Sequence, residues 1–307
     1  MPALSVRHKV LTILLAVGPF GAVSVVASAV ASAKPPAKTG HSWSVRWQPA
    51  RPVNGAPVVV RVASPGRLES LSGKWLGHDL YFSFDAKSNT WYAIAGAGLD
   101  TSPGKYPLAL VGKTAGGKEV SFQKPIAVGK GKYRKIAATV PKQYTEPSPE
   151  QLQRINEEKE LKHQVLSRVG PEREWAGNFL PPVEASISDV FGTARVFNGE
   201  TQSVHQGLDF GVPAGTPVAA LNRGTVLLAR QLFFEGGLVV LDHGQGLLTL
   251  YMHLSKIDIK EGEQIARGQE IGLSGGTGRA TGPHLHIAVR WQGIYLDPAI
   301  LFKLSLP

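Results

Sequence analysis

The stretch Gly282-Pro-His-Leu-His286, near the C-terminal end of a chain of 307 residues, places two histidines two positions apart. Side chains on a β-strand alternate between the two faces, so on a strand both rings would project from the same side. Two blocks upstream carry related residues, Thr249-Leu-Tyr-Met-His253 and His205-Gln-Gly-Leu-Asp209. Four of the nine histidines and one aspartate therefore fall into three short blocks. We expect an antiparallel sheet that presents these side chains on an open face.

These residue types are typical of a zinc site. Neutral imidazole and carboxylate are ligands that Zn²⁺ accepts, and the chain has no cysteine to supply a thiolate instead. A catalytic zinc takes about three protein ligands and leaves a further position for water. Within the pair at 284 and 286, one histidine could therefore bind metal while the other works beside it.

Other residues of a catalytic type are interpreted as structural. His8, His41, His78 and His163 have no neighbours that impose a geometry, and His243 in Leu241-Asp-His-Gly244 is typical of a strand end followed by a turn. Ser274 lies in Gly272-Leu-Ser-Gly-Gly276, which matches the G-x-S-x-G pattern of a serine nucleophile. That pattern requires a strand followed by a helix, and more glycine and threonine follow here, so we reject this interpretation.

The stretch from about Phe191 to Pro298 resembles the lysostaphin and LytM type of zinc metallopeptidase, which cleaves peptide cross-links in bacterial cell walls. The matching blocks are Phe191-Gly192, His205-x-Gly-x-Asp209, Gly215-Thr-Pro-Val218, Gly224-Thr-Val226, Thr249-x-Tyr251-x-His253-Leu254, Gly268-Gln269, Ile271-Gly272, Thr277-Gly278, Gly282-Pro-His-Leu-His286 and Asp297-Pro298. Chance could supply one such block, but not all of them in this order.

The resemblance implies roles for five residues. His205, Asp209 and His286 would hold the zinc, and His253 and His284 would be unliganded catalytic histidines. One of these two should orient or deprotonate the attacking water and protonate the leaving amine, and the other should hydrogen bond to the oxyanion; which does which stays open.

All five of these positions carry the residue that the resemblance requires. Some members of the family have lost ligands and act as activators of other wall enzymes, so an intact set favours an active enzyme. Asn198, a few residues before His205, could also reach the metal in a latent state, because an amide oxygen is a possible ligand.

The first residues predict export. Arg7, His8 and Lys9 precede the apolar stretch from Val10 to Val30, and Ala31-Ser-Ala33 is one of two small-residue cleavage sites. We expect residues 1–33 to be a signal peptide, with an uncleaved anchor helix as the alternative. The expected location is the periplasm, the cell envelope or the extracellular space, with no stable membrane span after cleavage.

The chain is basic, with 33 Lys and Arg against 23 Asp and Glu and a net charge of +10. A basic protein is attracted to polyanions. An exported chain meets anionic wall polymers, acidic stem peptides and membrane lipids, so we expect no nucleic-acid partner.

We expect a mainly β protein with two folded domains, because roughly 270 residues after signal cleavage exceed what one core usually serves. Alternating apolar residues separated by turn signals predict an immunoglobulin-like β-sandwich at 41–130. It resembles the small β-domain that precedes the catalytic domain in some family members. A linker at 141–178 should contain one helix, because Ser148-Pro-Glu-Gln151 is a capping box. Residues 179–307 should form the antiparallel catalytic domain.

The leading hypothesis is a secreted zinc endopeptidase that acts on peptidoglycan cross-links as a monomer. The alternatives are a wall-binding or activating module for other wall hydrolases, and a metallopeptidase directed at other proteins. Whether a glycyl-glycine or a D-alanyl bond would be cut stays open. We also expect residues 34–178 to position or restrict the catalytic domain without contributing to cleavage, so that a chain beginning near Gly177 would remain active.

Overall fold

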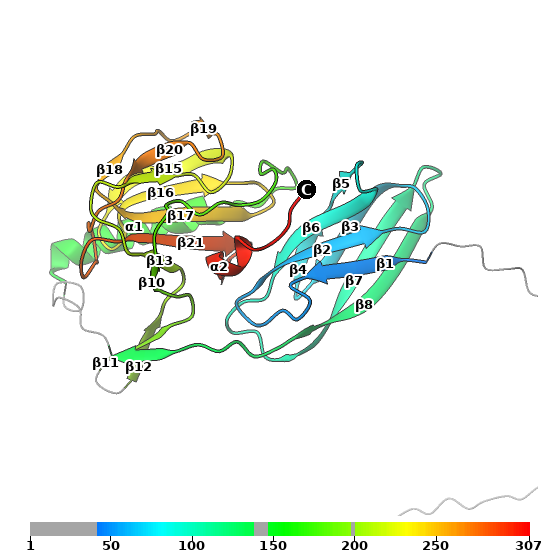
Figure 1. Cartoon of the computed structure of the whole chain (residues 1–307), viewed down its shortest axis with the longest axis horizontal. Helices are drawn as coiled ribbons and strands as arrows, with labels where there is room; N and C mark the ends of the chain where they lie inside the picture. Colours follow the sequence, from blue (N-terminus) through cyan, green and yellow to red (C-terminus); the bar gives the residue numbers. More distant parts are fainter. Residues whose placement is uncertain (1–41, 138–146, 198–199) are drawn as a thin grey trace, which may run out of the picture. The chain divides into compact units, whose positions relative to one another are not determined.

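The computed structural model describes residues 42–137, 147–197 and 200–307. These residues are mainly β-strands, accompanied by two helices (Figure 1), which confirms the predicted fold class. The predicted signal peptide and Asn198 lie outside the described residues. Within the described ranges, no helix is long and apolar enough to cross a membrane.

The first group of strands forms two four-stranded antiparallel sheets. One has the order β1-β2-β6-β5 and the other the order β4-β3-β7-β8. Counted along the chain, these orders correspond to the A-B-E-D and C′-C-F-G sheets of an immunoglobulin-like sandwich, as predicted. The strands are β1 (Ser44–Gln48), β2 (Pro57–Ala63), β3 (Leu68–Trp75), β4 (His78–Tyr81), β5 (Ser83–Asp85), β6 (Thr90–Gly96), β7 (Gly104–Thr114) and β8 (Glu119–Val128).

Two details of the sandwich differ from the sequence pattern. Strand β3 does not alternate throughout, because a register shift between Leu68 and Ser70 leaves buried Leu68 and Leu71 three positions apart. The stretch around Phe82, which alternates like one strand, is divided between two sheets. β4 pairs with β3, whereas β5 pairs with β6.

The second group of strands is built on an eight-stranded antiparallel sheet, here called the main sheet, of order β10-β13-β21-β17-β16-β15-β19 with β22 paired to β21. Two three-stranded sheets accompany it, of orders β12-β11-β9 and β14-β20-β18. The strands of the main sheet are β10 (Ile187–Asp189), β13 (Leu208–Phe210), β15 (Gly224–Leu232), β16 (Gly236–Asp242), β17 (Leu247–Leu254), β19 (Gln264–Ile265), β21 (Leu285–Trp291) and β22 (Ile294–Leu296). The smaller sheets contain β9 (Lys135–Ala137), β11 (Ala194–Phe197), β12 (Glu200–Val204), β14 (Pro217–Ala219), β18 (Lys256–Ile257) and β20 (Glu270–Leu273).

Both faces of the main sheet are apolar, which explains its near-continuous hydrophobic strands. In β21, Leu285, Ile287 and Val289 belong to the large core on one face, whereas Ala288 belongs to a smaller cluster on the other. Because side chains alternate along a strand, His286 lies on the face of the smaller cluster.

Helix α1 (Pro149–Leu166) covers part of that same face (Figure 1). Its predicted capping box is confirmed, because Ser148 and Gln151 exchange side-chain and backbone hydrogen bonds. Leu161, Val165 and Leu166 pack on the small cluster. An acidic stretch such as Glu157-Glu-Lys-Glu160 is typical of a solvated helix face, but Glu158 is buried and accepts hydrogen bonds from the Phe233 amide and from Arg154, each at 2.7 Å.

The second helix, α2 (Pro298–Leu301), is capped by the Asp297 side chain. Residues 40–307 fall into one compact unit. The borders of a linker at 141–178 and a catalytic domain at 179–307 therefore stay a proposal. Trp175, within the expected linker, is fully buried, and its ring lies 6.2 Å from that of Phe179.

Candidate metal centre

The structure brings the three expected ligands together. The Nε2 atom of His205 lies 3.0 Å from the Asp209 Oδ1 atom and 3.0 Å from the His286 Nδ1 atom, and the last two atoms are 2.7 Å apart. Asp209 on β13 and His286 on β21 are direct partners in the antiparallel ladder, which places their side chains side by side. His205 follows β12 and enters from a separate small sheet.

The chemistry of the three atoms fits a zinc ion. The Nδ1–H group of His205 donates to the Val190 carbonyl oxygen at 2.9 Å, so its Nε2 presents a lone pair to the other two ligands. Two imidazole nitrogens and a carboxylate oxygen thus converge, and a cation between them relieves their mutual repulsion. They are close enough for one ion to contact all three at about 2.0–2.2 Å.

Burial and hydrogen bonding shift the pKa values of Asp209 and His286 in the cluster formed by His205, Asp209 and His286. Burial alone would raise the pKa of Asp209, but the facing nitrogens of His205 and His286, when they carry a proton, donate hydrogen bonds that outweigh it and hold the pKa of this carboxyl group well below its usual range. The pKa of His286 is lowered, chiefly because its charged form would be desolvated. An ionised carboxylate and a neutral imidazole are the forms that bind metal.

Glycine at position 207 is required by the close approach of the chain to the cluster. A methyl group added to Gly207 would overlap the ring of His286 and the carbonyl oxygen of Ile287. The glycine between His205 and Asp209 therefore allows the chain to pass this close to the cluster.

His253 reaches the cluster through an irregularity of its strand. The register of β16 and β17 shifts next to it, and its φ of 63° lies in the left-handed region, which is uncommon for a residue other than glycine. Its amide donates to the Glu235 carbonyl oxygen, and its Nδ1–H group donates to the Thr277 carbonyl oxygen, each at 2.8 Å. The ring centroid of His253 thereby lies 6.1 Å from that of His286.

His284 stands beside His253, just before β21. Their ring centroids are 4.7 Å apart, and the His284 Nε2 atom is 3.9 Å from the Asp209 Oδ1 atom. The Nδ1–H group of His284 donates to the Gly282 carbonyl oxygen at 2.8 Å. In both histidines Nδ1 is engaged by a backbone carbonyl, which leaves Nε2 for a reacting group. Burial, followed by the charges of His284 and His286, lowers the pKa of His253 to about 4.

His243 and Ser274, which were interpreted as structural from the sequence, are both buried. His243 is fully buried, donates from Nδ1 to the Arg223 carbonyl oxygen at 2.7 Å and accepts at Nε2 from the Thr249 hydroxyl at 2.8 Å. Ser274 is also fully buried, and its hydroxyl donates to the Pro213 carbonyl oxygen at 2.6 Å. Neither side chain is available to a substrate.

Sequence reasoning missed the residues around the ligands. The carboxylate of Asp189 lies 3.4 Å from the Nδ1 atom of His205, and Arg195 lies 3.3 Å from Asp189 and 3.8 Å from the second oxygen of Asp209. The block Phe191-Gly192 next to Asp189 was noticed, but no spacing rule connects Asp189 with His205.

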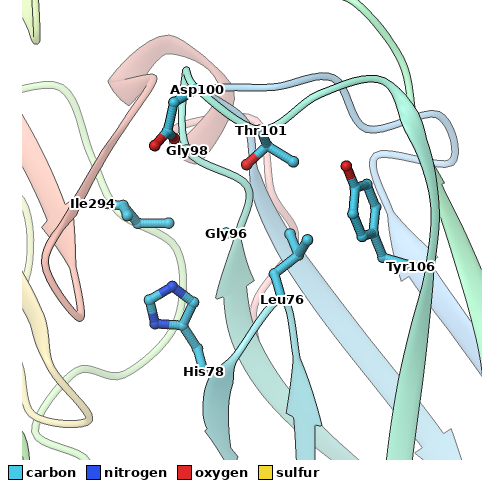
Figure 2. A pocket seen from close by; sticks show the side chains of 8 residues that line it. All are labelled: Leu76, His78, Gly96, Gly98, Asp100, Thr101, Tyr106 and Ile294. Carbon is cyan, nitrogen blue, oxygen red and sulfur yellow. The ribbon is translucent and has the colours of Figure 1, made fainter.

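A separate cavity of about 290 Å³ is lined by residues other than the clustered histidines (Figure 2). His78 and Asp100 line it together with apolar side chains such as Ile294. None of the five cluster residues lines this cavity, and its two candidate ligands are fewer than a zinc site needs.

Comparison with known proteins agrees with this geometry. The model of peptidase family M23 matches residues 203–298, which include all five cluster residues. A crystal structure from Pseudomonas aeruginosa, assigned to peptidase M23, is 32% identical with a TM-score of 0.62, and the match covers 82% of this chain and 95% of that chain. The chain belongs to peptidase family M23.

Two curated relatives match a third or more of this chain. The peptidoglycan DD-endopeptidase ShyA of Vibrio cholerae serotype O1 is 46% identical over 103 residues, which is 34% of this chain and 23% of ShyA. The DD-carboxypeptidase/endopeptidase Mpg of Neisseria meningitidis serogroup B is 38% identical over 121 residues, which is 39% of this chain and 28% of Mpg. The match thus spans about a quarter of the length of each relative.

Proposed function

We propose that this protein is an exported, zinc-dependent endopeptidase that hydrolyses peptide cross-links of bacterial peptidoglycan. The observation that carries the proposal is the convergence of the His205 Nε2, Asp209 Oδ1 and His286 Nδ1 atoms beside two further histidines. The names of ShyA and Mpg support the substrate class, because both describe endopeptidases and that of ShyA specifies peptidoglycan.

In this proposal His205, Asp209 and His286 hold the zinc. When bound, zinc supplies Lewis acidity, which polarises the scissile carbonyl and lowers the pKa of a water molecule so that it can lose a proton and attack at neutral pH. His253 and His284 supply the proton transfers, because each directs Nε2 away from the carbonyl that engages its Nδ1 atom. One ring would take the proton of the water at Nε2 and pass it to the leaving amine, and the other, in its protonated form, would donate from Nε2–H to the developing oxyanion; either ring can fill either role.

The proposed place of action is outside the cytoplasm, where the wall polymer lies. The predicted signal peptide at 1–33 and the net charge of +10 support this location, because wall polymers are anionic. We propose that the protein acts there as a monomer.

The test is digestion of purified peptidoglycan, followed by mass spectrometry of the soluble fragments. We expect cleaved cross-links in the zinc-loaded sample, none after chelation, and recovery when zinc is restored. The mass of the fragments also decides between a D-alanyl and a glycyl-glycine bond. If zinc-loaded protein binds walls but releases no fragment, the alternative of a wall-binding or activating module replaces this proposal.

A further inference from the structure

The metal ligand His205 has a carboxylate behind it. Asp189 ends β10, opposite Asp209 in the ladder, and its Oδ2 atom lies 3.4 Å from the His205 Nδ1 atom. The side chain of Asp189 is only 13% exposed, so its charge acts in a partly dehydrated environment. The Nδ1–H group of His205 is bonded to the Val190 carbonyl oxygen, and the negative charge of Asp189 behind the same nitrogen strengthens the ring as a ligand.

Asp189 is itself held by a residue from far upstream. The Arg134 Nη2 atom lies 2.5 Å from the Asp189 Oδ1 atom, and the Arg134 Nε–H group donates to the Thr193 hydroxyl at 3.2 Å. That hydroxyl lies 2.9 Å from the same Asp189 oxygen. Two points of attachment fix the plane of the guanidinium group against the carboxylate, which a lysine could not reproduce.

The backbone around Arg134 is anchored as well. The Ala194 amide donates to the Arg134 carbonyl oxygen at 2.9 Å, and β9 then pairs with β11 in parallel. On the other side, the Tyr133 hydroxyl donates to the Asn54 carbonyl oxygen in the sandwich, and its ring packs edge-on against Phe191. Arg134 is therefore held between the sandwich and the hairpin that leads to His205.

We propose that Arg134 and Asp189 are positioning residues for His205, so that the segment leaving the sandwich completes the surroundings of the metal site. Both residues lie outside the range 203–298 matched by the family model. The inference rests on the proposed function in assigning zinc to the cluster. Loss of partners behind a metal-bound histidine typically weakens metal affinity about 10- to 100-fold.

The test compares zinc affinity in full-chain variants by competition with a chromophoric chelator. We expect Arg134→Ala to raise the zinc dissociation constant about 10-fold, Asp189→Asn to raise it at least as much, and Arg134→Lys to restore only part of the loss. Replacement of zinc by Co²⁺ gives a second readout, because a shifted visible spectrum in Arg134→Ala would report a reoriented ligand.

Arg230→Ala is the matched control. Arg230 is 53% exposed and pairs with Glu261 through two hydrogen bonds, much as Arg134 is 50% exposed and makes two contacts. The control should keep wild-type zinc affinity and Co²⁺ spectrum. If Arg134→Ala also keeps wild-type zinc affinity and the wild-type Co²⁺ spectrum, or loses no more zinc affinity than Arg230→Ala does, the positioning role is refuted. Because affinity is measured without substrate, this outcome is independent of whether the protein cleaves peptidoglycan.

Discussion

At the scale of single residues, the histidines around the cluster differ in which nitrogen they offer. His205, His253 and His284 each donate from Nδ1 to a backbone carbonyl, whereas His286 points Nδ1 at Asp209. The backbone therefore selects the nitrogen that faces the site. Substitution of a proposed ligand should consequently affect zinc binding, whereas substitution of His253 or His284 should affect hydrolysis.

We expect His253→Ala and His284→Ala to keep stoichiometric zinc and to lose hydrolysis by about 10²- to 10³-fold, because each removes a proton-transfer or oxyanion contact. Asp209→Ala should instead lose the zinc itself. Elemental analysis and turnover of a cross-linked wall peptide measure the two properties separately. Near wild-type turnover in either histidine variant would mean that its role has been wrongly assigned.

A second prediction concerns stability and His243, which lies apart from the ligands. Burial lowers the pKa of His243 to about 4, from 6.5 when exposed. The unfolded chain therefore binds the proton first as pH falls, so this residue's contribution to stability is full above pH 6.5 and is lost between pH 6.5 and 4. The total loss is on the order of 3 kcal/mol, at about 1.4 kcal/mol per pKa unit.

Urea denaturation at pH 7.5 and pH 5 of the wild type and His243→Gln measures this contribution. The wild type should lose more unfolding free energy between the two pH values than the variant does. An equal loss in both proteins would show that His243 is not responsible for the pH dependence.

The five residues that the structure brings together could be predicted because each lies in a short block such as Gly282-Pro-His-Leu-His286, and the family resemblance of these blocks implied their roles. Asp189 and Arg134 could not be predicted, since the contact of Asp189 with His205 and that of Arg134 with Asp189 join segments distant in the chain. Nor could it be predicted that a register shift and a left-handed φ would bring His253 into the group.

At the scale of elements, α1 shows how a polar sequence can cover a sheet. Its capping box is local and was predicted, but its buried acid was not. Glu158 lies in an acidic stretch typical of a solvated surface, yet it bonds to the Phe233 amide on the turn after β15. The difference arises because tertiary contacts, not helix periodicity, decide which carboxylate is enclosed.

We expect Glu158→Ala to lower the free energy of unfolding by about 1.5–3 kcal/mol, since it removes a hydrogen bond from a buried charged group. Glu157→Ala, next to it on the exposed side of α1, should change stability by less than about 0.5 kcal/mol. Urea denaturation of both variants at neutral pH measures the difference. Equal effects would show that Glu158 does not anchor the helix.

At the scale of the whole molecule, the segments before residue 179 contact the main sheet and the surroundings of the metal site. Leu161 and Val165 of α1 pack on the face of the main sheet that carries His286, and Arg134 contacts Asp189. Residues 34–178 were expected to position or restrict the catalytic domain without contributing to cleavage, and these contacts predict in addition that they support the metal site.

A chain beginning near Gly177 should therefore unfold at lower urea concentration and bind zinc more weakly than the full chain. Denaturation and chelator competition on the two proteins provide the comparison. If the shortened chain matches the full chain in stability, zinc affinity and hydrolysis of a soluble wall peptide, the division of labour expected from the sequence is correct and the contacts of α1 and Arg134 are dispensable.

The most direct test of the central claim is a zinc titration of metal-free protein, with cleaved peptidoglycan cross-links quantified by mass spectrometry at each step. A site built from His205, Asp209 and His286 predicts that the rate of cleavage rises in proportion to added zinc and reaches a plateau at one ion per chain. Absence of cleavage at every zinc concentration, or a rate that does not depend on zinc, would contradict the account.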